Sequence, residues 1–303
     1  MNYKNIVSDA WKLAQEHSYL QWFAILPMMG AIIIDGLYIP LRYGRYFISD
    51  FWGVVNDFII TLQTSYNPLF IISIIAIIFA IIFHFLLSAF FEGGLIALIN
   101  KIIQSDHKRV RSSLGFGYAM SVYLRLLKLH ALTGIINPVL IYIGMSLLFE
   151  YQRYLFHLIL WPMLVIEFIA IFFRLGTIYS DYDLVLKNSQ IIGSIKNSFS
   201  IVIFNLKETL FIASIVLLII VRAIINLLLV FIVPLGLIWF TTSVLNITSN
   251  TIVISIMVFI ILFLYYYIVK FTSLFWVFTT AIWVYTFRAL SQSTQKDLEA
   301  ISG

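Results

Sequence analysis

Apolar runs of about 20 residues, separated by short polar stretches, recur along the whole chain. A helical run of this length crosses a hydrocarbon layer about 30 Å thick. Because that layer holds no water, each crossing segment must satisfy its own backbone N–H and C=O groups, which leaves helices or closed barrels. The sequence has no series of the short alternating strands that a barrel needs. The pattern therefore predicts an all-α, polytopic bundle of transmembrane helices.

Composition agrees with this prediction. The chain is 62% hydrophobic and 11% charged, whereas soluble domains are about half apolar and a quarter charged. Cys is absent, which excludes thiolate metal sites, thiol catalysis and disulfides. Residues 1–18 are polar and mixed in charge, and no small-residue cleavage site follows the first apolar run. We therefore expect that run to be a retained span and not a removed signal peptide.

Six spans are predicted within a single integral membrane domain, 1–303. They cover residues 20–40, 69–91, 129–149, 154–173, 209–231 and 252–287. A reversal at Lys270 would give seven spans, but the surrounding stretch "YYYIVKFTSLFW" has no turn residues. We therefore prefer one long last helix whose inner end projects from the membrane, followed by a polar cytoplasmic tail, 291–303.

The positive charges predict the orientation of these spans. With a cytoplasmic N-terminus, fifteen of the 19 Lys and Arg residues lie on the inner side, three lie outside and Arg222 lies within the bilayer. This is the distribution that the positive-inside rule describes, so both termini are predicted to be cytoplasmic. The loop "DHKRVR" then faces the anionic inner leaflet, where its basic residues contact lipid headgroups and need no nucleic acid as a partner. The residues assigned to that contact are Lys108, Arg109 and Arg111.

Three further segments have the amphipathic pattern of helices that lie on a membrane surface. Segment 46–63 is predicted to lie on the outer surface, and segments 1–19 and 183–208 on the inner surface. Similar approach segments before several spans suggest an internal repeat. A division near Glu150 would give two halves of opposite topology, as in many secondary transporters.

Several of these stretches carry a family resemblance. "YDLVLKNSQIIGSIKNSFSIVIFN" resembles an inner segment of bacterial membrane families related to the membrane domain of glycerophosphoryl diester phosphodiesterases, although Phe199 stands where Trp is common. "SDAWKLAQEHSYLQWFAILP" and "TAIWVYTFRAL" look like the first and last segments of that group. The resemblance implies a six-helix module of the bacterial cytoplasmic membrane. It implies no phosphodiesterase activity, because that chemistry belongs to a separate soluble domain.

Ionisable residues inside the predicted spans are the best candidates for sites, because such charges are costly and usually face partners. Counted from the inner ends, Asp35 and Arg222 lie at similar heights of about 20 Å, and we expect them to form a buried pair. His84 and Glu167 both lie about 10 Å above the inner boundary and form a second candidate pair. Each pair is either a structural contact between helices or part of a substrate or proton path.

No motif for a metal, a phosphate, a dinucleotide or a catalytic serine is found. We therefore predict no cofactor and a non-enzymatic membrane scaffold or accessory subunit, with lipids and other membrane proteins as its partners. The alternative is a small-solute or ion permease that uses Asp35, Arg222, His84 and Glu167. A third possibility, an intramembrane lipid enzyme, has only Glu92 and Asp106 near a headgroup, and Glu92 is better explained as the inner end of the second span.

The orientation can be tested with single introduced cysteines, because the natural chain has none. In intact cells, a membrane-impermeant thiol reagent should modify R153C and leave R111C unmodified until the inner face is opened to the reagent. Reaction of R111C from the cell exterior would invert the whole topology.

The predicted Asp35–Arg222 pair gives a second test. R222L should lower the stability of the folded protein by about 3–5 kcal/mol, because it leaves one buried charge without a partner. The double variant D35L/R222L should recover much of that loss, as measured by the yield of folded protein and its thermal midpoint in detergent. Equal yields and midpoints for the single and double variants would count against the pair.

Overall fold

The computed structural model describes residues 3–25, 27–28, 67–105, 110–136, 153–222 and 251–302, with five isolated positions: Gly53, Asn56, Ile60, Ile141 and Ile224. These residues form helices and turns without a strand, which confirms the all-α prediction for this part of the chain. The named elements are α1 (Tyr3–Glu16), the short 3-10 helix η1 (Ser18–Leu20), α4 (Asn67–Gln104), α5 (Ser112–Ile135), α7 (Arg153–Gly176), α8 (Ser180–Leu186), α9 (Ile191–Phe204) and α11 (Thr251–Ser302).

Three described segments are long and apolar enough to cross a membrane: Leu86–Gln104, Leu160–Leu186 and Tyr266–Gln295. Another is gained if Ile191–Phe204 and Leu206–Arg222, which meet at a bend of 98°, count as one broken span. These segments overlap the predicted spans 69–91, 154–173, 209–231 and 252–287. Most of the other two predicted spans, 20–40 and 129–149, lies outside the described residues.

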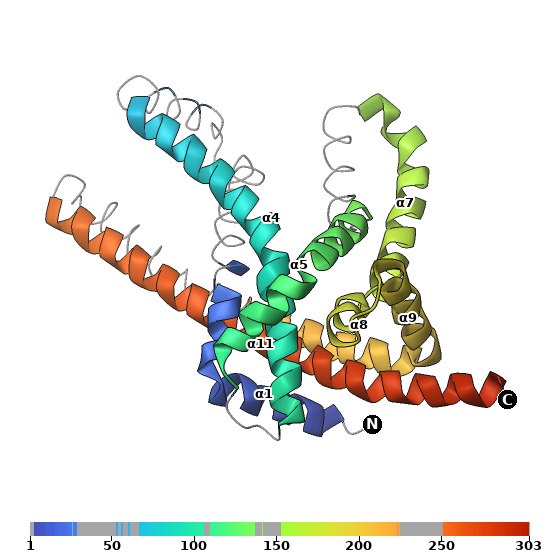
Figure 1. Cartoon of the computed structure of the whole chain (residues 1–303). Helices are drawn as coiled ribbons and strands as arrows, with labels where there is room; N and C mark the ends of the chain where they lie inside the picture. The colour runs from blue at the N-terminus through green and yellow to red at the C-terminus, as the bar shows by residue number, and fades with distance from the viewer. Residues whose placement is uncertain are drawn as a thin grey trace.

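The two longest helices diverge from a common junction (Figure 1). α4 has 38 residues and continues well past the predicted end of the second span. α11 has 52 residues and runs without a break through Lys270 and the polar segment 291–302. This continuity matches the preference for one long last helix, since no Gly or Pro interrupts the segment.

The buried core lies at the junction of α4 with α11. One large cluster of buried apolar side chains joins the C-terminal half of α4 to the second half of α11 and to α1. Trp11 of α1 packs on Phe275 and Phe278 of α11, with ring centroids 6.1 and 5.0 Å apart. The amphipathic face of segment 1–19 therefore packs against protein, with Leu13 fully buried.

The segment 183–208, predicted as one surface helix, is divided between α8 and α9. The break falls at Asn188, whose φ of 56° is in the left-handed region. Asn adopts this conformation more readily than most residues do, which explains why the helix stops at this position. Of the predicted outer helix 46–63, only three isolated positions belong to the described residues.

Two consecutive glycines allow α4 and α5 to approach closely. A Cβ atom on Gly93 would lie 2.9 Å from Val122 Cγ2 on α5. A Cβ atom on Gly94 would lie 2.8 Å from Phe23 Cε1 and 3.0 Å from the backbone oxygen of Gly115. Because a backbone oxygen cannot move aside as a side chain can, position 94 requires glycine for packing.

This requirement predicts opposite effects at two helical glycines. G94A should lower the free energy of unfolding by about 1–3 kcal/mol, as overpacking does. G117A should raise it by about 0.5–1 kcal/mol, because alanine favours the helix and no atom lies within 4 Å of a Cβ at Gly117. Thermal unfolding of the two variants in detergent measures both effects. A shift of both variants in the same direction would contradict the close approach of α4 and α5.

Candidate functional site

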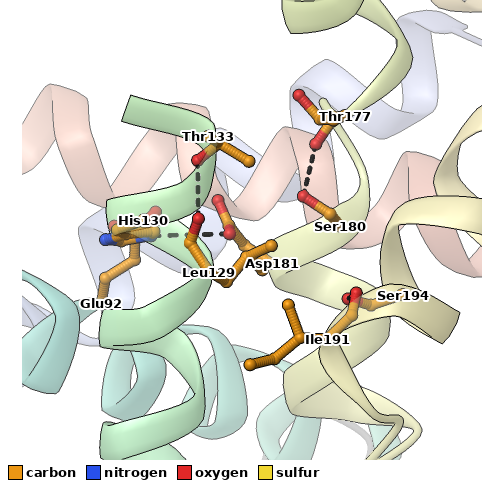
Figure 2. Close-up of polar contacts among 9 residues, drawn as sticks. All are labelled: Glu92, Leu129, His130, Thr133, Thr177, Ser180, Asp181, Ile191 and Ser194. Atoms are coloured by element: carbon orange, nitrogen blue, oxygen red, sulfur yellow. Dashed lines mark hydrogen bonds and ion pairs between the residues drawn. The ribbon is translucent and has the colours of Figure 1, made fainter. Parts of the chain in front are cut away.

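Three ionisable side chains from three helices converge beside the junction (Figure 2). His130 of α5 lies with its Nε2 3.5 Å from Asp181 Oδ1 of α8 and 3.7 Å from Glu92 Oε2 of α4. One ligand-type atom from each residue can be chosen so that all three lie within 4.8 Å of one another. The side chains are partly buried, with exposed fractions of 28% for His130, 18% for Glu92 and 16% for Asp181. We call these residues the Glu92–His130–Asp181 cluster.

The packing of α4 against α5 places the first two members. Val122, Leu126 and Leu129 follow one another at helical spacing on α5, and all three are buried. Val122 and Leu126 face Gly93, where the missing side chain lets the helices approach. Glu92 precedes that glycine and His130 follows Leu129, so the same contact brings their side chains together.

The turn between α7 and α8 places Asp181. Thr177 N–H bonds back to the Phe173 carbonyl, and Ser180 closes the turn through its N–H and its hydroxyl, both of which donate to the Thr177 carbonyl at 3.0 and 2.6 Å. Asp181 follows in the first turn of α8, where a carboxylate interacts favourably with the helix dipole. Figure 2 shows its side chain directed across to His130 on α5.

Residues 181 and 183 serve opposite sides of α8. Two positions along a helix correspond to a rotation of about 200°, so the two carboxylates point in different directions. Asp181 faces the cluster, whereas Asp183 is fully buried and accepts hydrogen bonds from Ser189 Oγ at 2.7 Å and Asn197 Nδ2 at 3.2 Å. Lys187 adds an ion pair at 3.5 Å. A helix of 7 residues is thereby fixed on both faces.

The charges of the cluster are only partly compensated. Two carboxylates face one imidazole, and Arg174 lies near enough to act electrostatically on Glu92 and His130. With a neutral imidazole and both carboxyl groups ionised, the two carboxylates outnumber the guanidinium, so the group in that state attracts a further positive charge. That charge can be a proton on His130 or a bound cation, and partial burial strengthens either interaction relative to water.

Only part of the predicted site falls in the described residues. Asp35, Lys108 and Arg109 lie outside them. Arg222 and Arg111 are exposed in the described part, and Glu167 on α7 is partly buried. His84 belongs to α4, but its side chain is not among those described. The Asp35–Arg222 and His84–Glu167 pairs and the contacts of the basic loop with anionic lipid stay predictions.

Of the three cluster residues, the sequence points only to Glu92, as an acid of the lipid-enzyme alternative together with Asp106, which lies outside the described residues. His130 and Asp181 were not singled out, because neither lies in a recognisable motif. The available signal was the pair Gly93–Gly94 beside a carboxylate, which marks a close approach between helices.

Comparison with known proteins identifies no relative. The chain matches no known family profile, no curated protein and no solved structure. The resemblance to the membrane domains of glycerophosphoryl diester phosphodiesterases therefore stays a prediction from the quoted segments, and the function is argued from the structure of this chain alone.

Proposed function

We propose that this chain is an integral membrane scaffold or accessory subunit of the bacterial cytoplasmic membrane, with six spans, both termini in the cytoplasm and no catalytic step of its own. The observation that carries the proposal is a set of side-chain hydrogen bonds that join helices far apart in the sequence at one junction. Such bonds fix helices relative to one another, which suits a protein that holds partners in place.

Three of these bonds attach α11 to the rest of the chain. Asn205, at the bend between α9 and the helix Leu206–Arg222, donates to Thr294 Oγ1 at 2.8 Å and accepts from Ser293 Oγ at 3.2 Å. Arg288 donates to Asn100 Oδ1 of α4 at 3.3 Å. The long last helix is therefore connected both to α4 and to the segment that follows α9.

A second group of hydrogen bonds holds the turns on both sides of α8. Arg125 of α5 donates to the carbonyls of Asn188 and Ser189 at 3.3 and 3.4 Å, and also to the side-chain oxygen of Asn188. Tyr179 N–H donates to Ser198 Oγ at 3.0 Å, and that hydroxyl donates to the Gly176 carbonyl at 2.6 Å. These contacts lie within and beside the segment that carries the family resemblance.

The apolar outer surface supports the membrane part of the proposal. Large apolar side chains of α7 are exposed, among them Trp161 at 73% and Phe168 at 62%. In water such a face would be costly, whereas lipid chains or the helices of another membrane protein cover it without penalty. The basic inner loops add the headgroup contacts expected from charge.

A permease is the second candidate, and Glu167 favours it. This carboxylate lies on a candidate span, and its Oε2 is buried without a hydrogen-bond partner among the described residues. An unpaired acid at such a position is a typical member of an ion or proton path. The scaffold remains the better supported function because the junction is extensively cross-linked by hydrogen bonds.

A single cysteine at position 167 distinguishes the two functions. In the scaffold, E167C should not react with a membrane-impermeant thiol reagent from either side of a sealed vesicle, because no water-filled path reaches it. R111C should react from the inner side in the same vesicles, and E167C should react after denaturation. Cross-linking in native membranes should also attach a stoichiometric amount of another membrane protein to the chain.

Either of two results would contradict the scaffold. Modification of E167C in sealed vesicles, together with a solute or proton flux that E167Q abolishes, would establish the permease. A chain that remains without a protein partner after cross-linking in its native membrane would also reject the proposed role.

A further inference from the structure

The Glu92–His130–Asp181 cluster has the composition of a metal centre. It offers one imidazole nitrogen and two carboxylate oxygens, each from a different helix. Imidazole nitrogens and carboxylate oxygens are both ligands of zinc and similar divalent ions, and a site with three protein ligands leaves a fourth position for water or another ligand. The scaffold proposal does not require this site, and the site does not depend on that proposal.

The distances from His130 Nε2 to the two carboxylates are close to those between two ligands of one ion. Charge-assisted N–H···O bonds are about 2.7–2.9 Å long. His130 Nε2 is farther than that from both carboxylates, at 3.5 Å from Asp181 and 3.7 Å from Glu92. Ligands placed tetrahedrally about 2.1 Å from one ion are about 3.4 Å from each other. We propose that Glu92, His130 and Asp181 bind a single divalent transition-metal ion of the zinc type.

The charge and exposure of the cluster suit such an ion. Metal binding requires both carboxyl groups in the ionised form, in which Glu92 and Asp181 together carry two negative charges and Arg174 compensates one of them at most. A divalent ion neutralises the remainder. All three side chains are partly exposed, so the ligand atoms are not sealed inside the protein.

The competing explanation is an ion pair in which a protonated His130 bridges the two carboxylates. The two explanations require different chemistry at position 130. A metal needs a lone pair on the side chain, whereas an ion pair needs a positive charge. Lysine supplies the charge without a usable ligand, and cysteine supplies a thiolate ligand without the charge.

The first experiment uses the purified full-length protein in detergent after treatment with a chelator. Co²⁺ should bind at one ion per chain and give the intense visible absorption of a four-coordinate ion, and Zn²⁺ should displace it and raise the thermal midpoint. The same titration of E16Q provides the matched acidic control, because Glu16 is exposed and paired only with Lys12 among the described residues.

The second experiment compares substitutions at His130. H130K should weaken Zn²⁺ binding by about 100-fold or more, which exceeds the effect of losing an outer-shell contact. H130C should retain stoichiometric binding and add the thiolate-to-cobalt charge-transfer band, since its thiol is the only one in the chain. H157C places the same thiol on another histidine position of the chain and should leave the wild-type spectrum unchanged.

Three results would overturn the site. The wild-type protein could bind no stoichiometric ion, H130K could bind it as tightly as wild type, or folded H130C could fail to bind it. If H130C does not fold, E92Q and D181N replace it, and full-strength binding by either folded variant rejects the assignment of that ligand and with it the three-residue site.

Discussion

Polar side chains in apolar surroundings need partners within the protein, because water is not available to them. Where α4, α5, α8, α9 and α11 pack together, this requirement determines which faces of these helices contact one another. Asp183 is fully buried, and among the described residues Ser189, Asn197 and Lys187 surround its carboxylate. Were α9 displaced, a buried carboxylate would lose its donors, which typically costs several kcal/mol. The polar groups therefore fix positions that apolar packing alone would leave adjustable.

The short helix α8 connects two polar centres because Asp181 and Asp183 point to opposite sides of it. Asp181 points toward α4 and α5, and Asp183 points toward the turn that leads into α9. A rotation or shift of α8 would disturb both centres at once. Arg125 reinforces this coupling because it reaches from α5 to the same turn. Direct side-chain contacts therefore connect α5 with the turn that leads into α9.

The sequence predicted well those features that depend on one segment at a time. Helices follow from apolar length and from the backbone requirement in lipid, and the continuity of α11 follows from the absence of Gly and Pro between Ile252 and Leu290. The division of 183–208 was missed although Asn188 offered a local signal. The helix that carries the second predicted span is longer than the span itself, since α4 continues beyond Glu92 to Gln104.

The cluster could not be predicted in the same way because its members lie on separate helices. Sequence spacing determines the face of a single helix on which a residue lies, but not which face of another helix will meet it. Gly93 and Gly94 carry the one partial signal, since a missing side chain beside Glu92 marks a place where another backbone approaches. Identifying His130 as the residue opposite Glu92 required the packing of α5 itself.

An ion in the cluster would act on the same junction as the hydrogen bonds. Each ligand comes from a different helix, so one bound ion would join α4, α5 and α8 at a single point. α8 is also held to α9 through Asp183, and Asn205 at the end of α9 is bonded to α11. Loss of the ion would consequently remove the link between α4, α5 and α8. Loss of a bond at Asn205 would affect only the attachment of α11. An ion bound at the cluster would therefore act on α9 and α11 as well, through these hydrogen bonds, and not only on the three helices that supply its ligands.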